Sequence, residues 1–157
     1  MPLLAVGGRF PEQSLPDLEG RPRPLAETWA AGQALLIVGH ADCETTRLAL
    51  PYVDRIHTGR PAGTTVLAVL QEDPEGARAL RKRLGLAMPA LLDLAPHAFG
   101  PALGLETVPT LLHVDRSGHV VAVVEGFRRD ALEALAVAVG APSPFTKDDP
   151  APALRPG

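Results

Sequence analysis

Apolar residues follow two patterns along the chain, and the order of these patterns predicts the secondary structure. Continuous apolar runs at 34–40 and 64–70 have the length of strands buried on both faces of a parallel sheet. Apolar residues at helical spacing predict helices at 43–57, 74–85 and 128–140, with shorter helical stretches at 25–32 and 96–104. Further strands are predicted at 90–93, 110–115 and 119–126.

This order predicts an α/β protein with a mixed central β-sheet and helices on both faces. The runs 110–115 and 119–126 surround a Ser-Gly turn, which favours an antiparallel hairpin after a parallel first half. A length of 157 residues indicates one domain, which we place at 1–140. Residues 141–157 contain five prolines and are expected to form an extended or disordered tail outside the core.

Composition excludes several classes of function. Hydrophobic residues make up 46% of the chain and charged residues 21%, as in ordinary soluble proteins. The net charge is −3, and the densest basic run, 78–83, fits the solvated face of a helix, so we expect no nucleic-acid partner. The start of the chain lacks a basic segment before its apolar residues, and no apolar run approaches the length of a membrane span. A cytoplasmic protein is therefore expected.

The single cysteine occupies a distinctive place. Cys43 follows the apolar run 34–40 and begins the helix 43–57, which contains Pro51. A helix N-terminus carries unsatisfied N–H groups and a partial positive charge, which favour a thiolate able to attack a disulfide or a peroxide. Proline inside a helix costs roughly 3 kcal/mol, so a sequence that keeps it usually needs the bend. The alternative is that the helix begins at Pro51 and that 43–50 is a loop.

Four stretches together resemble thioredoxin-fold proteins of the redoxin group, of the TlpA/ResA type of thiol-disulfide interchange protein. They are the cysteine at the start of a helix, Pro51 eight residues later, "EDPEGARALRKRLGLAMPALLD" (72–93) and "ETVPTLLHVDRSGHVV" (106–121). The similarity runs from about residue 6 to residue 140. It implies a thioredoxin fold, a cis peptide bond before Pro109, and a platform for the substrate backbone formed by Val108, Pro109 and Thr110. No cofactor and no metal are implied.

The sequence departs from the family at one position of the site. Thr46 stands where the family usually has its second cysteine, so "CETT" replaces Cys-x-x-Cys. A hydroxyl there can form a hydrogen bond with the thiolate of Cys43 but cannot resolve a mixed disulfide. We therefore expect monothiol exchange completed by an outside sulfur, from glutathione, another low-molecular-weight thiol or a second protein.

Three neighbours of Cys43 allow opposite interpretations. Asp42 and Glu44 place negative charge beside the thiol, which disfavours a thiolate. Alternatively, Asp42 is the N-cap of the helix and Glu44 complements the helix dipole. His40 could donate a hydrogen bond to the thiolate, although a histidine at a strand end is more often a polar side chain with another partner.

Two other functions remain open from the sequence. In the first, Cys43 is inert and the loop at Pro109 pairs with an extended peptide, so the protein is a redox-inactive binding module. In the second it is a one-cysteine peroxidase of the peroxiredoxin type. This is disfavoured because His40 and Leu36 occupy the positions of that family's hydroxyl residue and proline, and only Arg47 could approach the thiol. The five histidines lack metal-ligand spacing, although His113 and His119 flank the hairpin turn.

Overall fold

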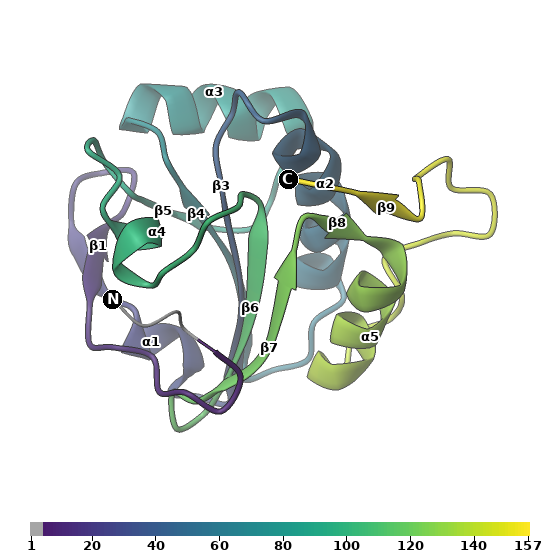
Figure 1. Ribbon diagram of the computed structural model, residues 1–157, viewed down its shortest axis with the longest axis horizontal. Coiled ribbons are helices and arrows are strands. Elements are labelled where there is room, and N and C mark those ends of the chain that lie inside the picture. Colours follow the sequence, from purple (N-terminus) through teal and green to yellow (C-terminus); the bar gives the residue numbers. More distant parts are fainter. Residues whose placement is uncertain (1–4) are drawn as a thin grey trace.

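The structure is a computed structural model that describes residues 5–157, and a five-stranded sheet forms its centre (Figure 1). The strand order is β5-β4-β3-β6-β7. Strand β3 pairs in parallel with β4, which pairs in parallel with β5, whereas β6 is antiparallel to both β3 and β7. The mixed sheet predicted from the sequence is therefore present. Its strands are β3 (Gln33–Gly39), β4 (Thr64–Leu70), β5 (Ala90–Leu92), β6 (Thr110–Asp115) and β7 (Val120–Glu125).

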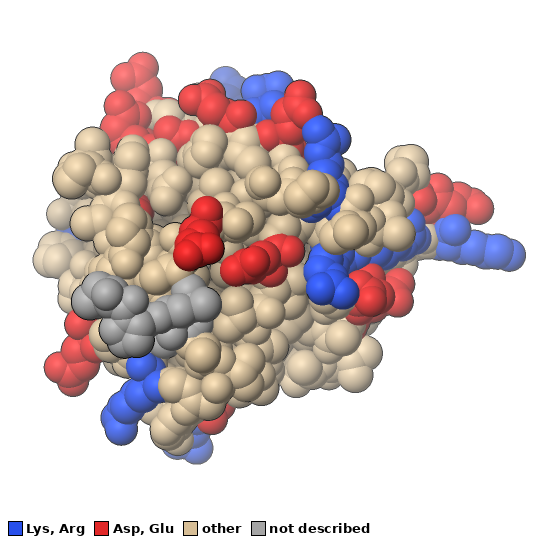
Figure 2. Space-filling model, viewed as in Figure 1, with Lys and Arg blue, Asp and Glu red and all other residues tan. Residues whose placement is uncertain are grey.

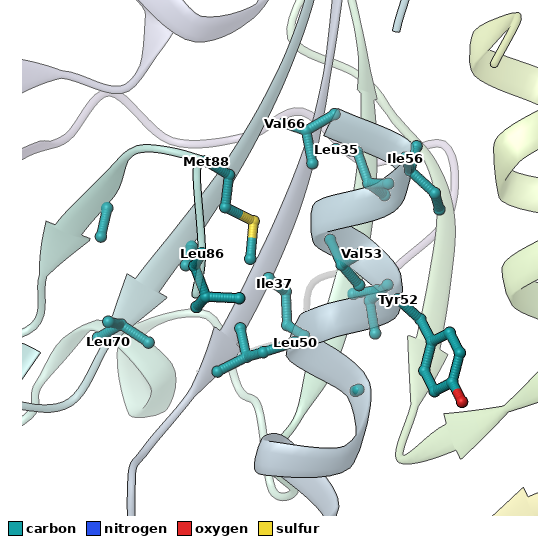
Figure 3. Close-up of a cluster of buried hydrophobic side chains, with 14 of the residues drawn as sticks. Leu35, Ile37, Leu50, Tyr52, Val53, Ile56, Val66, Leu70, Leu86 and Met88 are labelled. Carbon is teal, nitrogen blue, oxygen red and sulfur yellow. The ribbon is translucent and has the colours of Figure 1, made fainter. Parts of the chain in front are cut away.

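Helices cover both faces of the sheet. Alternate residues of β3 point to opposite sides, so Leu35 and Ile37 join one apolar cluster while Leu36 and Val38 join the other. Figure 3 shows the first cluster, where Leu50, Val53 and Ile56 of α2 meet Leu35 and Ile37. Burial on both faces explains why β3 is a continuous apolar run. The first cluster is covered by α2 (Glu44–Thr58), α3 (Pro74–Leu84) and α5 (Arg129–Val139), and the second by α1 (Ala26–Trp29) and α4 (Phe99–Ala102).

The ends of the helices follow local chemistry. At the start of α3 the Asp73 side chain accepts a hydrogen bond from Gly76 N (2.7 Å), and Gly85 closes the helix with φ +66°. Pro51 lies inside α2, so the alternative in which the helix begins at Pro51 is wrong. No helix within residues 5–157 is long and apolar enough to cross a membrane.

The sequence did not indicate the hairpin of β1 (Ser14–Pro16) and β2 (Pro22–Pro24). The Asp17 side chain holds its turn by accepting hydrogen bonds from Arg21 N (2.9 Å) and Arg23 Nε (3.2 Å). Partial burial raises the pKa of Asp17, but these hydrogen bonds outweigh that effect and lower it to about 2. The hairpin shows no apolar alternation, and polar contacts of one carboxylate help to hold it together with the strand pairing and the buried Leu15.

Residues 141–157 differ from the loose tail that their composition predicts. The segment leaves α5, loops outward and returns, so that β9 (Leu154–Arg155) pairs with β8 (Phe127–Arg128) and the chain arrives over α2 (Figure 1). On the way the Phe145 ring packs 4.7 Å from the Tyr52 ring, centroid to centroid. Composition did not indicate this order, because an aromatic ring, a carboxylate and the side chain of Arg129 hold the segment. The domain boundary at residue 140 stays a prediction.

That carboxylate belongs to Asp149, whose side chain is 7% exposed. It accepts hydrogen bonds from the backbone and hydroxyl of Thr146 and from the Tyr52 hydroxyl (3.1 Å), and it forms an ion pair with Arg55 (3.1 Å). The hydrogen bond from Thr146 N has the largest effect on its pKa. Together these contacts lower the pKa of Asp149 to about 2, although burial raises it. Asp149 therefore stays charged while it joins the segment to α2.

We expect Asp149→Asn to lower the free energy of unfolding at pH 7, with the loss shrinking in acid. The folded pKa lies below the unfolded value of about 3.9, so the carboxylate stabilises the fold above about pH 4 and this contribution is lost as the pH falls toward 2. Urea unfolding at pH 7, 4 and 3 measures the difference. The exposed neighbour Asp148 supplies the control, Asp148→Asn. An equal loss at every pH would contradict this role.

Candidate functional site

Cys43 is the N-cap of α2. Its backbone is extended (φ −90°, ψ 117°), and its Sγ accepts a hydrogen bond from Thr46 N at 3.4 Å. Cys43 is partly exposed, and its sulfur lies at the end of the helix where N–H groups are unsatisfied. The cap predicted from the sequence was Asp42, and this prediction is wrong, because Asp42 is exposed and the next residue makes the capping contact.

A second loop lies against the sulfur. The Cys43 thiol donates to the carbonyl of Val108 at 3.6 Å, and the Val108–Pro109 peptide bond is cis. The loop is held in place because Pro109 O accepts from Gly126 N (2.8 Å) and the Thr110 hydroxyl donates to Thr107 O (2.6 Å). The structure thus brings together Cys43 and the predicted platform at the neighbouring ends of β3 and β6.

Thr46 contacts the sulfur in a different way from the one expected. Its backbone N–H makes the hydrogen bond, while its hydroxyl is buried and has no hydrogen-bond partner among the described residues. The side chain points at Gly39, where an added Cβ would lie 2.6 Å from the Thr46 methyl carbon. Helical geometry explains why the backbone and not the hydroxyl of Thr46 contacts the sulfur, because the third residue of a helix presents its N–H to the cap. Gly39 provides the space for the side chain.

The other predicted modulators, His40, Asp42 and Glu44, make no hydrogen bond to the sulfur of Cys43 among the described residues. The carbonyl of His40 accepts from Cys43 N (3.2 Å), and the His40 side chain lines a cleft of about 260 Å³ together with Gln71 and His97. Glu44 is exposed and forms an ion pair with Arg155. The charge of Glu44 is therefore offset by a residue distant in sequence, which leaves the exposed Asp42 as the carboxylate without such an ion pair among the described residues.

The contacts of Arg47 argue against the peroxidase alternative, and those of His113 and His119 argue against a site formed by these two histidines. Arg47 Nη1 donates to the carbonyl of Ala41 and so holds the loop before Cys43. His113 Nε2 lies 2.8 Å from Gln33 Oε1, whereas His119 Nδ1 lies 3.9 Å from Asp115, so the two imidazoles have separate partners. Burial lowers the pKa of His113. Among residues 5–157 no three His, Cys, Asp or Glu side chains form a group that could hold a metal.

Sequence reasoning missed the contribution of the C-terminal residues to the site. The Thr45 hydroxyl donates to Pro156 O (2.7 Å), and Gly157 lies against Val108. Figure 2 shows acidic and basic side chains side by side where β9 reaches α2, in the region of the Glu44–Arg155 ion pair. No periodicity or motif marks these residues. The one available signal was Phe145, an aromatic residue inside a proline-rich stretch.

No family model matches the chain, and no curated protein matches it. The chain is similar to a candidate protein disulfide isomerase from Bacteroides thetaiotaomicron, with 18% identity, 87% of this chain and 89% of that chain covered, and TM-score 0.77. It is also similar to a candidate thiol:disulfide interchange protein DsbE from Chlorobium tepidum, with 22% identity, 86% of this chain and 96% of that chain covered, and TM-score 0.76. A third similar structure is a secreted Mycobacterium tuberculosis disulfide oxidoreductase homologous to E. coli DsbE, with 17% identity, 81% of this chain and 96% of that chain covered, and TM-score 0.69. The chain has the thioredoxin fold that its sequence predicted.

We expect Thr46→Val to raise the free energy of unfolding by about 1 kcal/mol, because a buried hydroxyl without a partner is removed at constant shape. Cys43 should keep its alkylation rate, since the backbone N–H of residue 46 remains. The matched change Thr45→Val removes the hydrogen bond to Pro156 and should cost about 1 kcal/mol. Urea unfolding of both variants tests the contrast. Destabilisation by Thr46→Val would mean that its hydroxyl has a stabilising partner.

Proposed function

We propose that this protein performs monothiol thiol-disulfide exchange through Cys43. One observation carries the proposal: Cys43 is partly exposed at the start of a fifteen-residue helix, and its sulfur lies between the N–H of Thr46 and the carbonyl of Val108. The fold is shared with solved structures that are described as disulfide oxidoreductases and interchange proteins. The chain has no second cysteine, which limits the chemistry to one protein sulfur.

The reaction has two displacements. The Cys43 thiolate attacks one sulfur of an external disulfide RS–SR, forming Cys43–S–S–R and releasing RS⁻. An external thiolate R′S⁻ then attacks the R sulfur, forming RS–SR′ and releasing the Cys43 thiolate. Electrons balance without a cofactor, since the net change is exchange of RS⁻ for R′S⁻. In a cytoplasm, the location expected from the sequence, low-molecular-weight thiols would supply R′S⁻.

The surrounding groups have distinct roles in this proposal. The N–H of Thr46 and the positive end of α2 stabilise the thiolate as attacker and as leaving group. Arg155 offsets Glu44, so the carboxylate beside the sulfur opposes the thiolate less than the sequence alone suggests. Val108 would be the part of the predicted platform against which the attacked disulfide lies, because Pro109 and Thr110 are buried behind it.

We expect the folded protein to form a mixed disulfide when it is incubated with glutathione disulfide. Intact-mass spectrometry should show one glutathione added to the chain, reversed by reduced glutathione. Cys43→Ser should show no addition. If the unfolded chain reacts in urea while the folded chain does not, Cys43 is inert in the fold. That result would favour the binding-module alternative.

We expect Thr46→Cys to produce a dithiol site that forms an internal disulfide with Cys43. The residue is buried three positions after the cysteine, and the small Gly39 leaves room for a sulfur. After oxidation by glutathione disulfide the variant should take up no N-ethylmaleimide, and after reduction it should take up two, measured by intact-mass spectrometry. Thr45→Cys is the matched control, because residues two apart on a helix do not face each other. Formation of an internal disulfide in both variants, or in neither, would contradict the proposed site geometry.

A further inference from the structure

We propose that residues 154–157, here called the C-terminal strap, restrict Cys43 to low-molecular-weight disulfides by covering the surface where an extended polypeptide would lie. This inference rests on the proposed exchange activity and names its substrate class. The strap passes between the first turn of α2 and the loop at Val108, which are the two segments that contact the Cys43 sulfur.

The strap is fixed to α2 by two side-chain contacts. The Thr45 hydroxyl donates to Pro156 O at 2.7 Å, and Thr45 is 4% exposed. Arg155 forms an ion pair with Glu44, the residue that follows the cysteine. Both contacts lie within the first turn of α2, so the strap covers the side of the helix start that Thr45 occupies.

On its other side the strap packs directly on backbone. Strand β9 pairs antiparallel with β8, and an added Cβ at Gly126 would lie 2.8 Å from Arg155 O. Gly126 also donates to Pro109 O, so the strap and Pro109 share the same support. A Cβ at Gly157 would overlap the Val108 carbonyl and the Thr107 methyl group, so this glycine lies in direct contact with the expected platform.

These contacts exclude an extended polypeptide from the surface beside Cys43 and leave room for a small disulfide. A polypeptide aligned with the backbone of Val108 would need the place of Gly157, and main-chain pairing is what gives such complexes their affinity. Cys43 itself is partly exposed, and the cleft beside it, lined by His40, Gln71, His97 and Val108, has a volume of about 260 Å³, which suits only a small molecule. A small disulfide needs no pairing with Val108 to reach Cys43, whereas an extended polypeptide does.

The segment before the strap prevents it from opening freely. Arg129 Nη1 donates to Asp149 O (3.2 Å) and Ala151 O (3.0 Å), and Arg129 N donates to Ala153 O (3.0 Å). With the Asp149 contacts to Tyr52 and Arg55, these bonds fix the chain up to the start of β9. A polypeptide substrate would have to break the strap contacts before it could bind.

The test compares two thiol probes on the full chain: N-ethylmaleimide, and an extended octapeptide with a maleimide at its centre. The variant Arg155→Ala/Gly157→Val removes the ion pair and places a side chain against Val108. Its peptide-maleimide rate should rise about fivefold, the upper end for loss of an exposed ion pair, with an unchanged N-ethylmaleimide rate. A second variant, Leu154→Pro, disturbs the β8–β9 pairing and should act in the same direction.

The control Lys147→Ala/Ala153→Val changes exposed side chains of the same segment and should leave both rates unchanged. Equal peptide-maleimide rates in the present chain and both strap variants would overturn the proposal, as would a matching rise in the control. Maleimides react with any accessible thiol, so this result does not depend on exchange activity. Failure of the glutathione reaction would refute the proposed function alone.

Discussion

The pairing of β3 with β6 is the constraint on which the site depends. The antiparallel register places Val38 opposite Thr110, so the residues after β3 and those before β6 emerge at the same edge. Cys43 and Val108 are 65 positions apart in the sequence, yet the sulfur lies 3.6 Å from the Val108 carbonyl. The helix start, the cysteine and the proline loop therefore owe their proximity to backbone hydrogen bonds between the two central strands.

The sequence predicted those parts of the fold that apolar burial determines. Strands such as β3 and β4 read as continuous apolar runs because both faces are covered, and helix α2 could be located although it contains Pro51. The proximity of Cys43 to the Pro109 loop was predicted from a motif and not from the periodicity of apolar residues. The β1–β2 hairpin could not be predicted, because the polar contacts of Asp17 fix it and leave no apolar pattern.

The finer chemistry of the site depended on contacts that local sequence does not specify. The Thr46 hydroxyl faces Gly39 because of the phase of α2, which a prediction uncertain by a residue or two at each helix end cannot resolve. The charge beside Cys43 depends on Arg155, 111 positions from Glu44. A proline-rich composition describes how a segment behaves by itself, and it carries no information about an ion pair with the other end of the fold.

The short strands and loops at the rim also decide how the sheet can meet other chains. Strand β5 has only three residues, and the first part of β7 is bonded to residues 7–8 through Gly7 N to Val120 O and Val120 N to Gly8 O, both 2.8 Å. An unpaired edge is a template for uncontrolled association with further strands. The short length of β5 and the bonds to Val120 therefore limit the free edge at two places, and the second of these is protected by residues that belong to no layer of the domain.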